Sequence, residues 1–228
     1  VNYNWKKRYY LTVNGRYDGA SNFAANNKWA FFPSAAAKWN IAAENWMKDA
    51  KWIDDLSIRL SAGLTGNDAI GAYQSLANMS STTGGYLFDG SQPVAFYRSR
   101  LDSPDLTWEK TAAYNVALDW SMFKGRLNGT IEYYSKQTTD MLYTYTVPSP
   151  PYLYRSMMAN VGDMSNKGIE VLLNFDAIKT KNFSWNTTLN LAHNKNEVTR
   201  LSNDQFTTDR IYAGDAWVRG GSGGTTHV

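Results

Sequence analysis

Apolar and polar residues alternate with a period of two along much of the chain. This period indicates β-strands with two different faces, because successive side chains of a strand point to opposite sides. In the clearest segment, one row is Tyr114, Val116, Leu118, Trp120 and Met122 and the other is Asn115, Ala117, Asp119 and Ser121. The pattern predicts seven strands, at 9–18, 34–41, 56–65, 114–122, 127–134, 168–176 and 185–192. The segment 124–126 is predicted as a tight turn that joins two of them into a hairpin.

The strands fit either a membrane β-barrel or a soluble β-sandwich. Their length favours the barrel, because a tilted strand crosses a bilayer with about 9–11 residues, whereas soluble strands usually have about 5–6 residues. Charge in the more polar row also favours the barrel, because a watery lumen tolerates it and a sandwich core does not. We therefore predict as lumen-facing the residues Arg16, Asp18, Lys38, Arg59, Asp119, Glu132, Glu170 and Asp176.

The connections between the strands differ in length. Those at 123–126 and 177–182 are short, whereas those at 66–106 and 141–163 are long and are predicted to be irregular. Outer-membrane barrels have short periplasmic turns and long extracellular loops. The connection 43–54 fits less well, because it lies on the short-turn side yet is longer, and we expect one helical turn at 44–48. Seven is fewer than the roughly eight strands of the smallest bacterial barrels, so we expect an internal piece of a larger protein.

Composition supports the barrel and excludes other classes. The chain has 228 residues with 9 Trp, 15 Tyr and 9 Phe, yet its mean hydropathy is −0.48. A membrane barrel combines these features, because only alternate strand residues meet lipid. A net charge of +3 is too small and scattered for a nucleic-acid partner. No cysteine is present, which excludes disulfides and thiolate metal sites. Neither a transmembrane helix nor a signal peptide is visible.

Several segments resemble one family in order along the chain. Arg16-Tyr17-Asp18-Gly19-Ala20-Ser21-Asn22-Phe23, followed by Phe32-Pro33-Ser34, resembles a signature of SusC/RagA-type TonB-dependent outer-membrane transporters. The resemblance continues at 56–67, Leu106-Thr107-Trp108-Glu109-Lys110-Thr111, 160–170 and 214–223. It implies an all-β, antiparallel transmembrane barrel of about 22 strands with an N-terminal plug. Residues 1–228 would then be part of this barrel domain, with the plug and the other strands outside the chain.

The resemblance also implies a function and its partners. Such proteins lie in the outer membrane of Gram-negative bacteria and cross it many times. They import a nutrient oligomer, either an oligosaccharide or a peptide, together with a SusD-like surface lipoprotein and driven by TonB. The expected partners of this chain are therefore that lipoprotein, TonB through the missing N-terminal region, the cargo and outer-membrane lipid. The lumen-facing residues would contact mainly the plug.

The long loops carry the candidate contact residues. Aromatic rings stack on sugars, and arginine binds hydroxyls and carboxylates. Contacts with cargo or with the lipoprotein are expected at Tyr86, Phe88, Tyr97, Arg98, Tyr152, Tyr154 and Arg155. Packing within the loops is the alternative for these residues. Tyr143 and Tyr145 fit the interfacial aromatic girdle better, because they continue the fifth predicted strand.

No residues form a catalytic or metal-binding pattern. His193 and His227 are the only histidines, and no acidic cluster is spaced to join them as metal ligands. Asp54-Asp55 begins a strand and Asp102-Ser103-Pro104-Asp105 has turn chemistry. We therefore expect no enzyme, cofactor or metal site. Two alternatives stay open: an adhesive or structural barrel that binds partners through its loops, and an outer-membrane hydrolase.

Overall fold

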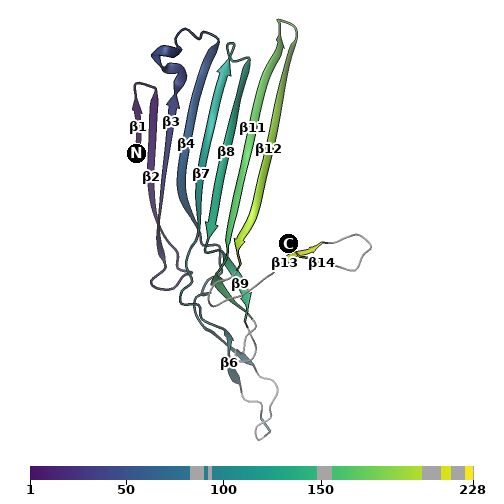
Figure 1. The fold of residues 1–228 in the computed structure, drawn as a ribbon. Coiled ribbons are helices and arrows are strands. Elements are labelled where there is room, and N and C mark those ends of the chain that lie inside the picture. The colour runs from purple at the N-terminus through teal and green to yellow at the C-terminus, as the bar shows by residue number, and fades with distance from the viewer. Residues whose placement is uncertain (83–89, 92–93, 148–155, 202–211, 217–223, 228) are drawn as a thin grey trace.

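Antiparallel β-strands form most of the molecule (Figure 1). The computed structural model describes residues 1–82, 90–91, 94–147, 156–201, 212–216 and 224–227. The main sheet has eight strands in the order β1-β2-β3-β4-β7-β8-β11-β12. Their bounds are β1 Asn2–Trp5, β2 Tyr9–Gly19, β3 Trp29–Asn40, β4 Ile53–Asn67, β7 Glu109–Met122, β8 Leu127–Thr139, β11 Asp163–Lys179 and β12 Ser184–Arg200. Strands that are neighbours in this sheet also follow one another along the chain, except where a separate loop hairpin lies between them in sequence.

The seven predicted strands are confirmed as β2, β3, β4, β7, β8, β11 and β12. Most are longer than predicted, and β11 and β12 have 17 residues each. The short strand β1 was not predicted, although Tyr3 and Trp5 alternate with Asn2 and Asn4 in it. Four residues are too few for a periodic pattern to stand out from chance.

The strand β3 begins at Trp29, five residues before its predicted start. The predicted strand starts directly after Pro33, because proline is rare inside strands. Proline cannot donate to a β-ladder and is confined to positions where one side of the strand is free. Pro33 pairs with Gly15 of β2, whereas pairing between β3 and β4 starts only at Ser34 with Gly63. The proline therefore lies where β3 has one neighbour instead of two.

Short and long connections lie at opposite ends of the sheet, as predicted (Figure 1). The short end carries the β1–β2, β7–β8 and β11–β12 turns and two 3₁₀ turns, η1 Ile41–Ala43 and η2 Asn45–Met47, where one helical turn was predicted. The prediction that the long connections are irregular was wrong. They contain two-stranded hairpins of β5 Asn78–Thr82 with β6 Ala95–Arg100 and of β9 Leu142–Thr146 with β10 Ser156–Asn160. A further hairpin joins β13 Tyr212–Ala216 to β14 Gly224–His227.

The turn between β7 and β8 shows why the hairpins at the short end are tight. Phe123, Lys124 and Gly125 have φ of 56°, 59° and 79°. Positive φ in consecutive turn residues gives the twist that matches two antiparallel strands. Asp54 stabilises this turn, because its carboxylate accepts a hydrogen bond of 2.9 Å from the amide of Gly125.

The strand register gives the sheet one apolar and one polar face. Directly paired residues point to the same side of an antiparallel sheet. The apolar face includes Leu11, Ala37, Leu60, Val116, Tyr133, Ile169 and His193, each paired with the next in this order. Leu11, Val116 and Tyr114 are 45%, 48% and 59% exposed, so no second sheet covers this face within the described residues. The interpretation as a soluble sandwich is therefore wrong.

No helix in the described part of the chain is long and apolar enough to span a bilayer.

Candidate transport wall and rim

Four charged residues of the polar face lie on one line across the sheet, which we call the charge row. Lys38 pairs with Arg59, Arg59 with Ala117, Ala117 with Glu132, and Glu132 with Glu170. The row therefore has a positive half on β3 and β4 and a negative half on β8 and β11. Like charges directly opposite each other destabilise a sheet, so both halves require compensation.

Arg59 provides the compensation at the centre of the charge row. Its guanidinium donates to both carboxylate oxygens of Asp119, at 2.5 and 3.1 Å. A second contact joins Nη2 to Oε2 of Glu132 at 3.8 Å. Ala117 makes this reach possible, because its small side chain lies between them and is only 3% exposed. Thr130 also donates to Asp119 at 2.8 Å, which fixes the carboxylate.

The ends of the charge row are different from its centre. Neither Lys38 nor Glu170 forms an ion pair with another described residue. A hollow of about 210 Å³ lies along the positive half, and its lining includes Tyr10, Lys38, Arg59, Asn115 and Glu132. Asn115 is held there by its hydrogen bond of 3.1 Å to Ser61. The polar face thus offers a charged hollow together with two charged residues that form no ion pair with another described residue.

The remaining predicted lumen residues are placed as follows. Arg16 and Asp18 form an ion pair of 2.7 Å on β2, and the Arg16 guanidinium lies 5.6 Å from the centre of the Phe32 ring. Asp176 lies near the short end of β11 and contacts Lys179 at 3.9 Å. These residues are therefore partnered within their own strand or hairpin, and they stay separate from the charge row.

Two of the segments that carried the family resemblance, at 16–34 and 106–111, meet at the long-loop end of the sheet. Their apolar residues form a cluster that we call the rim core, consisting of Ala20, Phe23, Phe32, Leu106 and Trp108. The Trp108 ring lies 5.3 Å from Phe23 and 5.4 Å from Phe32, measured between ring centres. Leu142 of β9 and Met158 of β10 pack against the cluster. The rim core thus joins β3, the segment before β7 and the β9–β10 hairpin.

A polar clasp joins the same segments beside the rim core. The Asn160 amide donates to the carbonyls of Thr107 and Asp140 at 2.8 Å each, and its oxygen accepts from the Thr107 amide at 2.8 Å. The Glu109 carboxylate accepts from the Leu142 amide and from the Asn67 side chain, both at 3.1 Å. Asn160, Glu109 and Asn67 were quoted for the resemblance but were not predicted as a site. Only their proximity in space reveals the clasp.

The loop candidates divide into two groups. Tyr97 and Arg98 lie on β6 opposite Ser80 and Met79, and adjacent strand residues point to opposite faces of the hairpin. Arg98 therefore shares a face with Phe96, which is 71% exposed. The other candidates, Tyr86, Phe88, Tyr152, Tyr154 and Arg155, lie outside the described residues.

Arg100 was missed as a positioning residue for the β5–β6 hairpin. Its guanidinium donates to the Gln74 side chain at 3.0 Å and to the carbonyl of Tyr73. It also reaches the Leu76 carbonyl at 3.4 Å. One side chain thus ties the end of β6 to the loop that precedes β5. An arginine in a polar loop carries no sequence signal that would distinguish this role.

The assignment of Tyr145 to the interfacial girdle was wrong. Tyr145 lies on β9, which pairs with β10 and does not continue β8 in the main sheet. Its ring packs with Ala159 and Val161 and is 4% exposed. The hydroxyl donates to the carbonyls of Val161 and Leu201 at 2.9 and 3.3 Å. Burial raises the pKa of the Tyr145 phenol above its usual value. Tyr145 therefore anchors the hairpin from inside.

The fold and this arrangement define the wall of an antiparallel membrane-type barrel with an elaborated loop end. The chain belongs to the family described as TonB dependent receptor-like, beta-barrel, whose profile matches residues 1–223. Members of this family are receptors and transporters of the outer membrane.

Similar proteins agree with this membership. The chain is 35% identical over 223 residues to the TonB-dependent receptor SusC of Bacteroides thetaiotaomicron, covering 96% of this chain and 22% of SusC. It is 39% identical over 208 residues to the TonB-dependent receptor P26 of Formosa agariphila, covering 90% of this chain and 20% of P26.

Solved structures show the same fold. A chain of the RagAB peptide importer in its open-open state matches with a TM-score of 0.82 and 28% identity, covering 98% of this chain and 24% of that one. The closed-closed state gives a TM-score of 0.80 and 30% identity, covering 89% and 22%. The chain thus spans about a fifth of the length of the curated relatives that it matches.

Proposed function

We propose that this chain forms part of the wall of a TonB-driven importer in the outer membrane of a Gram-negative bacterium. The cargo is a nutrient oligomer, an oligosaccharide or a peptide, delivered with a SusD-like surface lipoprotein. The observation that carries the proposal is the charge row, which crosses five strands, from β3 to β11, on the face opposite to the apolar, exposed one. The similarity to SusC and to the RagAB peptide importer supports both the partner and the cargo classes.

On this proposal the polar face lines the barrel lumen. Arg16, Asp18, Lys38, Arg59, Asp119, Glu132, Glu170 and Asp176 then face the plug domain that would fill the barrel. Lys38 and Glu170 contact oppositely charged groups of the plug, because neither has an ion-pair partner on the described wall. When TonB remodels the plug, the same charges become accessible to the passing cargo.

The loop end captures the cargo under the lipoprotein. Arg98 and Phe96 present a cation and an exposed ring on one face of the β5–β6 hairpin. Interfaces rely on such aromatic and arginine residues. Tyr86, Phe88, Tyr152, Tyr154 and Arg155 remain proposed contacts in the same loops, and Tyr97 contributes from the other face of the hairpin.

We infer that the chain acts in binding and transport and not in catalysis, without a cofactor. The receptor character of the family supports this. In the described residues, no group of three or more His, Asp or Glu could hold a metal ion. Purified full-length protein that cleaved a glycan or a peptide without its partners would contradict the inference.

Uptake measurements test the import proposal. Labelled oligosaccharides and peptides are supplied to wild-type cells and to cells that lack the full-length gene, TonB or the SusD-like lipoprotein gene. We expect uptake of one cargo class to require all three of these components. Uptake that is unchanged without TonB would overturn the proposal. Binding of other proteins by the full-length protein, without any uptake of cargo, would favour an adhesive barrel.

A further inference from the structure

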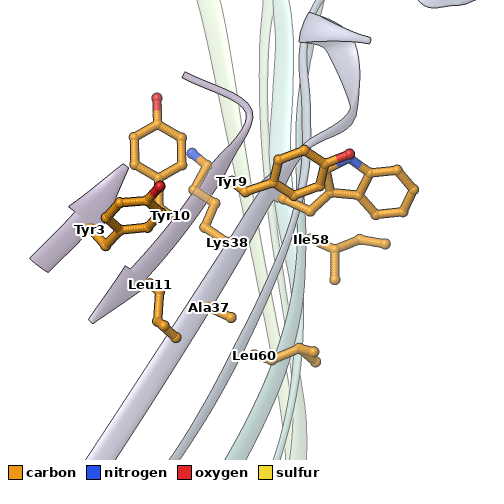
Figure 2. A pocket seen from close by; sticks show the side chains of 9 residues that line it. Tyr3, Tyr9, Tyr10, Leu11, Ala37, Lys38, Ile58 and Leu60 are labelled. Atoms are coloured by element: carbon orange, nitrogen blue, oxygen red, sulfur yellow. The ribbon is translucent and has the colours of Figure 1, made fainter. Parts of the chain in front are cut away.

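A furrow runs along β3 on the apolar face of the sheet. Its floor consists of alanines, since Ala35 pairs with Ala62 of β4 and Ala37 lies between Leu11 and Leu60. Two adjoining hollows of about 280 and 360 Å³ share the residues Leu11, Ala37 and Leu60. Figure 2 shows these three side chains at the first hollow, with Tyr3 and Tyr9 towards its short-turn end.

The furrow has a simple cause in the sequence. Methyl side chains follow one another on the apolar face of β3 at Ala35 and Ala37, whereas the two neighbouring strands carry Leu11 on β2 and Leu60 on β4. From Ala35 to Trp39 the strand rises by roughly 13 Å, at about 3.3 Å per residue. The hollow therefore follows the direction of the strand, which in outer-membrane barrels is tilted by roughly 35–45° and still crosses the leaflet.

Aromatic residues hold the short-turn end of the furrow open. Tyr9 and Trp39 both line it, and their rings are nearly parallel with centres 6.4 Å apart. Both donate to the same carboxylate oxygen of Glu44, Tyr9 at 2.7 Å and Trp39 at 3.1 Å. Because these bonds fix the two rings, neither ring is free to fold down and fill the furrow.

A cation lies beside these rings. The Lys6 ammonium is 4.8 Å from the centre of the Trp5 ring, and that ring lies 5.5 Å from Tyr9. Neither Lys6 nor Lys7 forms an ion pair with another residue that the structure describes, whereas Arg8 is bound by Glu44 at 3.2 Å. The short-turn end thus combines an apolar furrow with uncompensated positive charge.

We propose that the furrow binds one acyl chain of a phospholipid from the periplasmic leaflet, with Lys6 attracting its phosphate. The inference rests on the outer-membrane location proposed above. Lipid tails are as apolar as leucine, so the hydrophobic effect alone does not favour the furrow over bulk lipid. Selectivity comes from close packing along a preformed groove and from the attraction of basic residues to anionic headgroups.

Filling the furrow tests the acyl-chain site. The full-length protein is reconstituted in nanodiscs of phosphatidylcholine and phosphatidylglycerol that contain spin-labelled phosphatidylglycerol. We expect Ala37→Leu to reduce the motionally restricted lipid per barrel at least two-fold. Thr187→Leu is the matched control, because it adds bulk on the same apolar face but at β12, away from the furrow, and we expect it to change nothing.

Removing the charge tests the headgroup site. We expect Lys6→Ala to weaken the preference for phosphatidylglycerol over phosphatidylcholine about five-fold, the effect of one basic residue near an anionic surface. Lys181→Ala, in the β11–β12 turn, should leave the preference unchanged. Heat-modifiable migration on gels shows that each variant is folded.

Three outcomes would overturn the proposal. The first is a folded Ala37→Leu barrel with the same restricted lipid as the wild type. The second is an equal loss of preference in Lys6→Ala and Lys181→Ala. The third is efficient disulfide formation between two copies of Ala37→Cys, because a second barrel would then occupy the furrow. Cargo uptake is measured separately. A failed lipid test with normal uptake therefore contradicts only the lipid site and leaves the import proposal standing.

Discussion

Asn160 and the backbone of Thr107 exchange two hydrogen bonds of 2.8 Å each, across 53 positions of sequence. The side-chain amide thus bonds both backbone groups of Thr107, as a neighbouring strand would, and fixes β10 to the segment before β7. Because both groups are partly buried, loss of the amide leaves peptide groups of Thr107 without partners.

Replacing Asn160 with alanine is expected to loosen the β9–β10 hairpin. The cost should be about 1–3 kcal/mol, since buried backbone groups lose their partners. Hydrogen exchange of the full-length protein should rise within 142–146 and 156–160. Asn186→Ala, on the exposed surface of β12, is the control, and equal exchange in both variants would contradict the role of the clasp.

Substitution of Gly66 with alanine is expected to disturb the rim core. An added Cβ would overlap the Phe32 ring, and overpacking a core costs about 1–3 kcal/mol. The denaturation midpoint of the full-length protein should therefore fall. Phe32→Leu in the same chain should recover part of the loss, and a strictly additive double mutant would show that the two residues do not meet.

Acid is expected to loosen the short-turn end through Glu44. Hydrogen bonds from Tyr9 and then Trp39, together with the Arg8 charge, lower the pKa of this carboxyl below its ordinary value of 4.5. A lowered pKa stabilises the fold above the ordinary value, and this stabilisation is lost as the pH falls through the lowered pKa. Unfolding between pH 7 and pH 3 should show the loss in the wild type. Glu44→Gln should be less stable at pH 7 and lack this part of the pH dependence.

Arg59 is expected to couple the two halves of the charge row. Arg59→Met leaves the negative half uncompensated, and because the pair is partly exposed the cost should be about 1 kcal/mol. A double-mutant cycle with Asp119→Asn measures the coupling in unfolding experiments. Lys136→Met, at a polar-face position that makes no ion pair among the described residues, is the control. A coupling of zero would show that the contact contributes nothing.

Arg98 and Phe96 are expected to contribute to partner or cargo binding. Arg98→Ala and Phe96→Ala should each weaken binding by about 1 kcal/mol or more, measured by titration of the purified lipoprotein and of the cargo panel. Arg100→Ala should act differently, because it releases the hairpin and should also raise proteolysis near 73–76. Unchanged binding in all three variants would remove the hairpin from the interface.

The sequence by itself determined the strands, their two faces and the placement of short and long connections. These follow from the period of two, a local property of the extended backbone that needs no knowledge of neighbours. The motif segments also identified the family, because their order along the chain is itself a linear property.

Only the tertiary structure decided which residues meet. The charge row depends on the register between strands, and Arg59 and Asp119 are 60 positions apart. The loop hairpins, the burial of Tyr145 and the clasp at Asn160 likewise depend on partners far along the chain. The furrow depends on Ala35, Ala37 and Ala62 arriving side by side. The alternation of polar and apolar residues predicts the face of the sheet to which a side chain points. The register between strands decides which residues lie beside that side chain.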